Sequence, residues 1–191
     1  MAMACMLTSL VLVSATAAGG VVCDDISFDA AIEYQLTTVG DDRTFLRCVA
    51  TGDVDLDGDI DVLVSDRYGE EILIMMNDGA GALSYGGAVV ATGCERNRII
   101  LLEDLNGDGL LDIASASRGG AAIFLNQGSE EAWLGFSDVD VYPSGVEPHW
   151  IDAADLDLDG DQDLLVADFG EEDAQTGWNV FLNDGDGTFA D

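Results

Sequence analysis

Short apolar runs and polar turns alternate along the chain in a pattern that repeats every 51 residues. Each repeat holds three apolar runs with the length and composition of β-strands. The runs cover 48–50, 62–64 and 72–76 in the first repeat, 99–102, 113–115 and 122–125 in the second, and 150–154, 164–166 and 180–182 in the third. The third run of each repeat ends in Asn-Asp-Gly or Asn-Gln-Gly, which predicts a hairpin turn. A fourth strand is expected at 82–85 and at 133–136.

Four short antiparallel strands in a repeat of this length are typical of a β-propeller blade. We therefore predict an all-β chain with about three blades, which is an incomplete ring because propellers have about four to eight. A linear stack of repeats is the weaker alternative, since its repeats are usually shorter. The predicted boundaries are 1–18 for a signal peptide, 19–41 for an outer strand of a preceding or closing blade, and 42–92, 93–143 and 144–191 for the blades, the last one truncated.

An acidic loop follows the first apolar run of every repeat, with oxygen-bearing side chains at positions 1, 3, 5 and 9 and Gly at position 6. This donor set suits Ca²⁺, which takes about six to eight oxygen ligands. We expect one ion per loop, about three in all, held by these side chains and by the backbone carbonyl at position 7. The predicted ligands are Asp53, Asp55, Asp57, Asp59 and Asp61, then Asp104, Asn106, Asp108, Leu110 and Asp112, then Asp155, Asp157, Asp159, Asp161 and Asp163.

An EF-hand, a magnesium site and a plain acidic turn all fit these loops less well. An EF-hand begins with the same pattern but needs flanking helices and a Glu at position 12. That position holds Val64, Ser115 or Val166, within or beside β-prone runs, which excludes an EF-hand. Mg²⁺ demands tighter octahedral geometry, and a solvated acidic turn does not explain three copies in register. We expect structural ions, because a site filled by protein ligands leaves little room for substrate.

The charge balance also points to cations as partners. The chain carries 38 Asp and Glu against 6 basic residues, for a net charge of −32. Nucleic acid and anionic membrane surfaces are therefore excluded as partners, since neither gains from contact with such a protein. Much of the acid lies in the three loops rather than in one tail, so the chain does not resemble a disordered acidic segment.

The first 18 residues contain no charged side chain and resemble a secretory signal peptide, cleaved after Ala17 or Ala18. An uncleaved signal anchor is the alternative, and it is the only membrane attachment we expect. The chain is thus predicted to be secreted or displayed at the cell surface. Loss of Cys5 with the signal leaves Cys23, Cys48 and Cys94, and the sequence does not decide which two could form a disulfide.

The few basic residues recur with the repeat. Arg47, Arg98 and His149 each lie six residues before the first loop ligand. Their simplest role is to pair with surplus carboxylates. The alternative is that these three line one rim of the propeller and bind an acidic ligand such as a uronate polysaccharide. With one histidine in the chain, a histidine-based triad or a multi-histidine zinc site is not expected.

The three tryptophans, Trp133, Trp150 and Trp178, have two possible roles. They could stack on sugar rings, but we expect them to pack in the core or between blades.

Taken together, the loops and the Asn-Asp-Gly-Asp-Gly-Thr-Phe segment at 183–189 resemble the FG-GAP or VCBS-type repeats of integrin-α-like β-propellers, over residues 42–191. The only Phe-Gly is Phe169-Gly170 and no Gly-Ala-Pro follows the loops, so the bacterial type is the nearer likeness. The resemblance implies a calcium-stabilised, usually extracellular propeller with ligands at loop positions 1, 3, 5 and 9.

From these observations we expect a recognition, adhesion or scaffolding module that binds an extracellular protein or an acidic polysaccharide and has no catalysis of its own. The alternative is a fragment of a propeller-type polysaccharide lyase or related carbohydrate-active enzyme. A third possibility is a structural adhesin segment without a defined ligand.

Overall fold

The computed structural model describes residues 46–67, 70–90, 95–129, 132–145, 147–170 and 176–190, all within the compact unit Thr38–Asp191. The predicted signal peptide at 1–18, the predicted strand at 19–41 and three of the four cysteines (Cys5, Cys23 and Cys94) lie outside these residues. Cys48 is a free, half-buried thiol. No helix in the described part of the chain could span a membrane.

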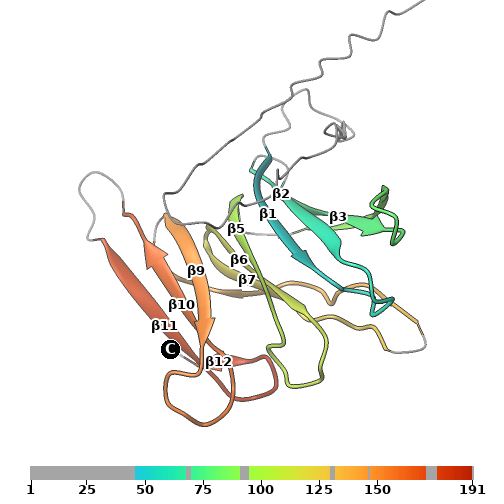
Figure 1. The fold of residues 1–191 in the computed structure, drawn as a ribbon. Coiled ribbons are helices and arrows are strands. Elements are labelled where there is room, and N and C mark those ends of the chain that lie inside the picture. The colour runs from blue at the N-terminus through green and yellow to red at the C-terminus, as the bar shows by residue number, and fades with distance from the viewer. Residues whose placement is uncertain are drawn as a thin grey trace, which may run out of the picture. The chain divides into compact units, whose positions relative to one another are not determined.

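The described residues form three four-stranded antiparallel sheets and contain no helix. The strands are β1 (Leu46–Gly52), β2 (Asp61–Asp66), β3 (Glu71–Asn77) and β4 (Leu83–Val90), then β5 (Glu95–Glu103), β6 (Asp112–Arg118), β7 (Gly120–Phe124) and β8 (Asp140–Tyr142), then β9 (Pro148–Ala154), β10 (Asp163–Asp168), β11 (Gly177–Asn183) and β12 (Phe189–Ala190). The sheets pack face to face without closing a ring (Figure 1). The prediction of an all-β chain with about three blades in an incomplete ring is confirmed.

Strands follow one another in chain order across each sheet, from β1 to β4, from β5 to β8 and from β9 to β12. The first strands of the sheets also contact one another, with β5 packed against both β1 and β9. The acidic loops join the first strand of each sheet to the second. The sequence repeat therefore places the three loops at equivalent points of three stacked sheets.

The fourth strand of the second sheet was placed wrongly by the sequence pattern. It lies at β8 rather than at 133–136, where the described residues form only isolated bridges such as Asn126 with Phe136. Gly135 adopts a positive φ of 84°, which interrupts an extended strand. Trp133 and Phe136 instead pack edge to face, with ring centroids 6.2 Å apart, against the core.

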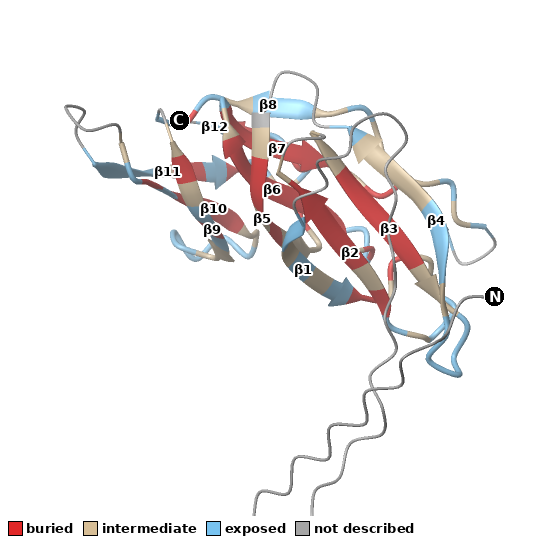
Figure 2. Cartoon of the chain, turned by 90° about the horizontal axis from the view of Figure 1, so that it is seen from above, coloured by how far each residue is buried: buried red, intermediate tan, exposed pale blue. Residues whose placement is uncertain are grey.

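Two apolar clusters fill the spaces between neighbouring sheets (Figure 2). The cluster between the first and second sheets includes Leu63, Ile72, Ile74, Ile100, Ile113 and Phe124, and the cluster between the second and third includes Ala114, Ala116, Ile123, Ile151, Leu164 and Phe181. The strand β6 is buried on both faces. Its alternating Ala and Ser side chains are small, which lets a sheet approach on either side.

In the second and third sheets, the asparagine at or just after the end of the third strand links that sheet to the one before it. Asn126 Nδ2 donates to the Leu111 carbonyl in its own sheet at 3.2 Å and to the Val54 carbonyl in the preceding loop at 2.8 Å. Asn183 Nδ2 likewise donates to the Gln162 and Leu105 carbonyls, at 3.0 and 2.7 Å. The sequence pattern suggested only a turn at these positions. They are in fact buried clamps between sheets.

Tryptophan packing is only partly as expected. Trp133 packs against the first cluster, whereas Trp150 and Trp178 are exposed. The expectation of core or inter-blade packing is wrong for these two side chains in this structure, because they lie on the face of the third sheet that no described sheet covers.

We predict that Asn126→Ala lowers the free energy of unfolding by about 1–3 kcal/mol, because two buried carbonyls lose their donor. The matched control is Asn77→Ala: Asn77 Nδ2 donates only to the Ile60 carbonyl among the described residues. We expect a loss below about 1 kcal/mol there. Urea denaturation of both variants measures the difference, and equal losses would contradict the clamp.

Candidate functional site

The aspartate at loop position 9 is the buried anchor of each acidic loop. Asp61, Asp112 and Asp163 have no exposed surface. One oxygen of each accepts the N–H of loop position 2, at 3.2, 2.9 and 2.8 Å, and the other accepts the backbone N–H of Asn77, Asn126 or Asn183, at 2.9, 2.7 and 2.9 Å. Burial, despite these bonds, raises the pKa of Asp112 to about 6. The predicted ligand at position 9 thus also ties the loop to the hairpin.

Carboxylates converge in the first and third loops. Asp53, Asp55 and Asp61 form one group, and Asp155, Asp157 and Asp159 form another, with donor oxygens all within 4.8 Å of one another in each group. Desolvation and then the neighbouring aspartates raise the pKa of Asp55. The clustered charge is therefore costly without a counterion.

The carboxylate at loop position 1 has an oxygen without a partner. Oδ1 of Asp53 and of Asp155 is buried and accepts no hydrogen bond from the described residues. A buried carboxylate oxygen normally has a partner. A group of converging carboxylates that contains such an unpartnered oxygen fits a hard cation such as Ca²⁺.

The middle loop differs from the other two. Asp104 accepts the N–H groups of Gly107, Asp108 and Gly109, at 2.8, 3.2 and 2.8 Å. Asn106, which replaces an aspartate, donates from Nδ2 to Asp108 Oδ2 at 3.0 Å. The structure thus brings the predicted residues of this loop together, but hydrogen bonds within the loop already engage their oxygens.

Loop position 4 adopts a left-handed backbone in all three copies. The residue is Leu56 with φ of 61°, Gly107 with 74° and Leu158 with 66°. A leucine in this region costs about 1–2 kcal/mol relative to glycine. Two of the three loops therefore hold strain, and these are the two loops with converging carboxylates.

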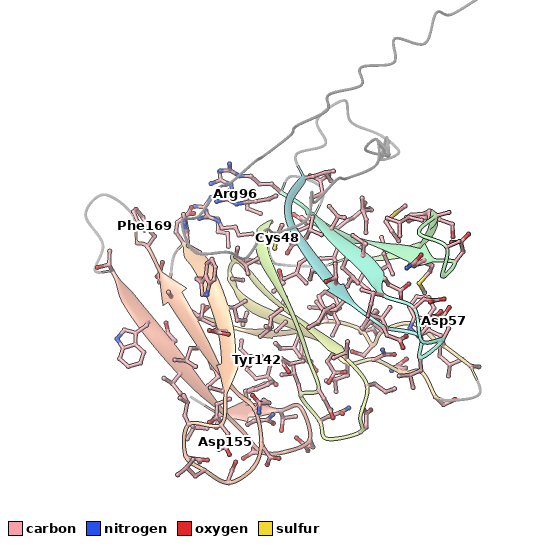
Figure 3. The ribbon with its side chains drawn as sticks, in the orientation of Figure 1. Cys48, Asp57, Arg96, Tyr142, Asp155 and Phe169 are labelled. Atoms are coloured by element: carbon pink, nitrogen blue, oxygen red, sulfur yellow. The ribbon has the colours of Figure 1, made fainter. Side chains whose placement is uncertain are left out.

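A basic cluster lies at the other end of the strands from the loops. In Figure 3, Arg96 and Phe169 lie at the end opposite Asp57 and Asp155. The cluster consists of five arginines: Arg47, Arg67, Arg96, Arg98 and Arg118. Burial, and then the charges of the other four, lowers the pKa of Arg98 to about 10.

One glutamate bridges much of this cluster. Glu147 pairs with Arg98, with Arg96 at 3.5 Å and with Arg118 at 3.8 Å. Arg98 is only 3% exposed, and its Nε has no hydrogen-bond partner among the described residues. The neighbouring Asn97 Nδ2 is also buried and unpaired among them. Two buried hydrogen-bond donors therefore have no partner among the described residues, in a cluster that holds most of the chain's positive charge.

The predicted rim residues Arg47, Arg98 and His149 act on one another electrostatically. Sequence reasoning missed Arg96 and Glu147, although these occupy equivalent positions of the repeat with opposite charge. His149 stacks on Phe169, with ring centroids 5.1 Å apart. Burial and then Arg98 and Arg47 lower its pKa, so it is mainly neutral at pH 7.

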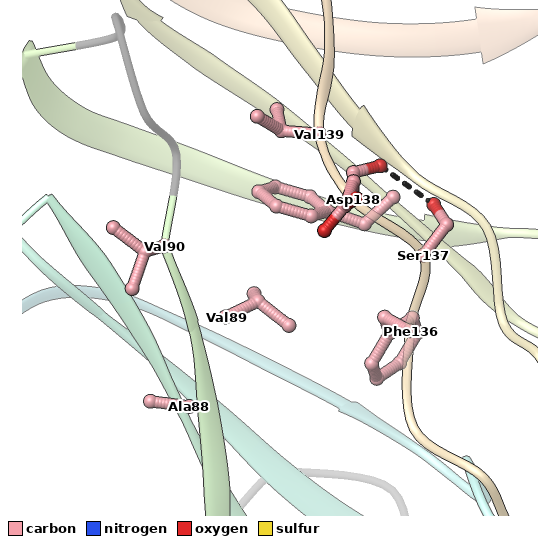
Figure 4. Close-up of a pocket in the computed structure, with 8 residues that line it drawn as sticks. Ala88, Val89, Val90, Phe136, Ser137, Asp138 and Val139 are labelled. Atoms are coloured by element: carbon pink, nitrogen blue, oxygen red, sulfur yellow. Dashed lines mark hydrogen bonds between the residues drawn. The ribbon is translucent and has the colours of Figure 1, made fainter.

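A separate pocket of about 430 Å³ lies between β4 and the segment 136–139 (Figure 4). Val89, Phe124, Phe136 and Val139 are among the side chains that line it. Among the described residues that line it, Asp138 alone is ionisable, and the Ser137 hydroxyl donates to the Asp138 carbonyl at 2.8 Å. These described residues offer no pair of ionisable groups for acid–base chemistry.

Comparison with known proteins gives one family match. Residues 104–166 match the family model described as FG-GAP-like repeat. The matched segment runs from the first residue of the middle loop into β10 and includes the clamp residue Asn126. No curated protein matches the chain.

We predict that the single histidine titrates with a pKa below 6.5, because burial and the adjacent arginines disfavour its charged form. Arg98→Gln should move this pKa upward toward its ordinary value. NMR titration of the one imidazole measures both. A wild-type pKa above 6.5, or no shift in the variant, would contradict the proximity of His149 to the cluster.

Proposed function

We propose that this chain, which belongs to the FG-GAP-type repeat proteins, is a secreted or cell-surface recognition module whose acidic loops bind structural Ca²⁺. The observation that carries the proposal is the buried Oδ1 of Asp53 and Asp155, which has no partner among the described residues and lies in each case in a group of converging carboxylates. FG-GAP repeats are typical of extracellular proteins, where Ca²⁺ is abundant, and this supports the location.

The first and third loops are the stronger sites in this proposal. Asp53, Asp55 and Asp61 would hold one ion and Asp155, Asp157 and Asp159 another, with the remaining ligands from the same loops. The middle loop would bind more weakly. Its Asp104 already accepts three N–H groups, which leaves less acceptor capacity for an ion than Asp53 or Asp155 has, and Asn106 brings one negative charge fewer.

A structural role follows from what each loop is attached to. In the third loop, Asp163 accepts the N–H of Asn183, whose side chain donates to the Leu105 carbonyl of the preceding loop. An ion that fixes the loop would therefore also fix the contact between sheets. The ions are proposed to stabilise the stack rather than to activate a substrate.

We expect Ca²⁺ at about ten times Kd to stabilise the protein by about 1.4 kcal/mol per site. Asp155→Asn should weaken one site by tenfold or more, because the unpaired ligand oxygen loses its charge. The matched control is Asp184→Asn, an equal charge change on an exposed residue of the last hairpin. Calorimetric titration after EGTA treatment measures both variants, and equal affinities would contradict the site.

The basic cluster is the proposed recognition site, and the proposed ligand is an acidic polysaccharide such as a polyuronate. Arginine suits carboxylates because its guanidinium donates in a planar fork. Glu147 already places one carboxylate among Arg96, Arg98 and Arg118. A ligand carboxylate would use the same chemistry at the exposed Arg47. His149 would contribute as a neutral donor at pH 7.

Two variants with opposite expected effects test this site. Arg47→Gln should weaken binding of polygalacturonate about tenfold, because a hydrogen bond to a charged group contributes about 1.5 kcal/mol. Glu147→Gln should strengthen it, because it removes a competing negative charge while the amide still accepts a hydrogen bond. Affinity electrophoresis compares the variants, with circular dichroism as the folding control. Unchanged binding in both would remove the ligand assignment and leave the calcium proposal standing.

A further inference from the structure

Position 3 of the middle loop differs chemically from the same position in the other two loops. It holds Asn106 followed by Gly107, whereas the first and third loops hold Asp-Leu there. Six asparagines occur in the chain, and Asn106 alone precedes a glycine. A backbone nitrogen can attack the side-chain amide of the asparagine before it, and glycine hinders this attack least because it has no side chain. Asn106 is therefore the asparagine that the sequence leaves most open to such an attack.

The reaction would release ammonia and create a carboxylate. The Gly107 nitrogen forms a bond to Cγ of Asn106, and the bond from Cγ to Nδ2 breaks. The proton of the Gly107 N–H balances the departing amide group, which leaves as ammonia, and a succinimide ring remains. Water then adds to a ring carbonyl and returns a proton to the Gly107 nitrogen. Addition at Cγ gives aspartate, whereas addition at the main-chain carbonyl gives isoaspartate.

Hydrogen bonds within the loop engage each group that reacts. The Gly107 N–H donates to Asp104 Oδ1 at 2.8 Å, so a carboxylate is in place to take the proton from the attacking nitrogen. The Asp108 N–H donates to Asn106 Oδ1 at 3.0 Å, where negative charge develops during the attack. Asn106 Nδ2, which becomes the leaving group, donates to Asp108 Oδ2 at 3.0 Å. A base, an oxyanion donor and a contact to the leaving group therefore surround one amide.

The loop is open to water and has room at the attacking residue. Asn106 is half-buried and Gly107 is exposed. Gly107 has a φ of 74°, and a Cβ at this position would meet no heavy atom within 4 Å apart from its chain neighbours. Leu56 and Leu158 adopt the same left-handed backbone at position 4 of their loops. Leucine at this position is thus compatible with the loop, and it provides a variant that hinders the attack.

We propose that Asn106 is a self-modification site, at which the middle loop converts its own asparagine into aspartate. In the first step Asp104 acts as the base for the Gly107 nitrogen. In the second step the Asp108 N–H polarises the carbonyl at Cγ and directs water to that carbon. Ring opening at Cγ restores the ordinary backbone, so aspartate rather than isoaspartate is the product.

The modification gives the middle loop the donor set of the other two. Position 3 is then a carboxylate in every loop, as at Asp55 and Asp157. Loss of Nδ2 also removes the hydrogen bond that engages Asp108 Oδ2. The consequence for the ion rests on the proposed function: the middle loop gains affinity for Ca²⁺ as the chain ages, because affinity in such loops depends on the charge of the ligands.

Peptide mass spectrometry of the EGTA-treated chain, sampled during incubation at neutral pH, measures the conversion. We expect the mass change of an amide-to-acid conversion at Asn106 and none at Asn179, an exposed asparagine that precedes valine. Asp104→Asn should slow the conversion about tenfold or more, because an amide still accepts the N–H but is too weak a base to take its proton. Gly107→Leu should slow it at least as much. Asp155→Asn, the equivalent change in the third loop, should leave it unchanged.

Three results would overturn the modification site, with circular dichroism as the folding control for each variant. No conversion in the folded chain, or faster conversion in the urea-unfolded chain, would mean that the loop protects the amide of Asn106. An unchanged rate in Asp104→Asn would remove the proposed base. Isoaspartate as the main product, separated from aspartate by chromatography of the peptides, would remove the directing role of the Asp108 N–H.

A Ca²⁺ titration of Asn106→Asp separates this inference from the proposed function. We expect the middle loop of the variant to bind Ca²⁺ about tenfold more tightly than that of the unmodified chain. Equal affinities would overturn the gain in affinity. Absence of Ca²⁺ binding in both proteins would overturn the proposed function, whereas the mass change at Asn106 would still be observed.

Discussion

A single relay of hydrogen bonds holds each sheet to the one before it. The buried aspartate at loop position 9 accepts the N–H of the clamp asparagine, and that side chain donates to a carbonyl of the preceding loop. Apolar side chains drive the sheets together, but their contacts do not set the register between neighbours. The relay does so, because its donors and acceptors are buried and must pair. The same hydrogen bonds therefore fix both the conformation of each loop and the position of one sheet on the next.

The distribution of charge follows from the same arrangement. The first strands of the sheets lie side by side and run the same way, so whatever precedes the first strand gathers at one end and whatever follows it gathers at the other. The acidic loops take one end and five of the six arginines take the other. A chain with a large net negative charge thereby keeps a positive region. The negative charge of Glu147 and the burial of Arg98 reduce the positive potential of this region.

Much of the fold could be predicted because the repeat places apolar runs at fixed intervals. The second and third strands of every sheet appear as β-prone runs, and the loop residues appear as spaced carboxylates. The position of β8 could not be predicted, since Trp133 and Phe136 have strand propensity and their packing depends on the neighbouring sheet. The clamp residues Asn126 and Asn183 have turn propensity as well. Only the stacked sheets show that their amides reach across to another loop.

The candidate sites, like the fold, have features that the sequence predicts and features that only the structure shows. Spacing alone locates the carboxylates of each loop, but it cannot tell which oxygens lack a partner. The difference between Asp53 and Asp104 depends on how many backbone N–H groups reach each carboxylate, one for Asp53 and three for Asp104. Arg96 and Glu147 could have been paired from the repeat, since opposite charges fall on one position of adjacent copies.

The direction of the clamp has a consequence for synthesis on the ribosome. Each loop emerges before the asparagine that satisfies it, 72 residues later from Val54 to Asn126 and 78 later from Leu105 to Asn183. A nascent sheet must therefore wait, with one carbonyl and one apolar side exposed, until its successor has left the exit tunnel. A chaperone that binds during that interval would contact the most recently folded sheet. Once the next sheet folds and covers it, the exposed apolar face is that of the next sheet.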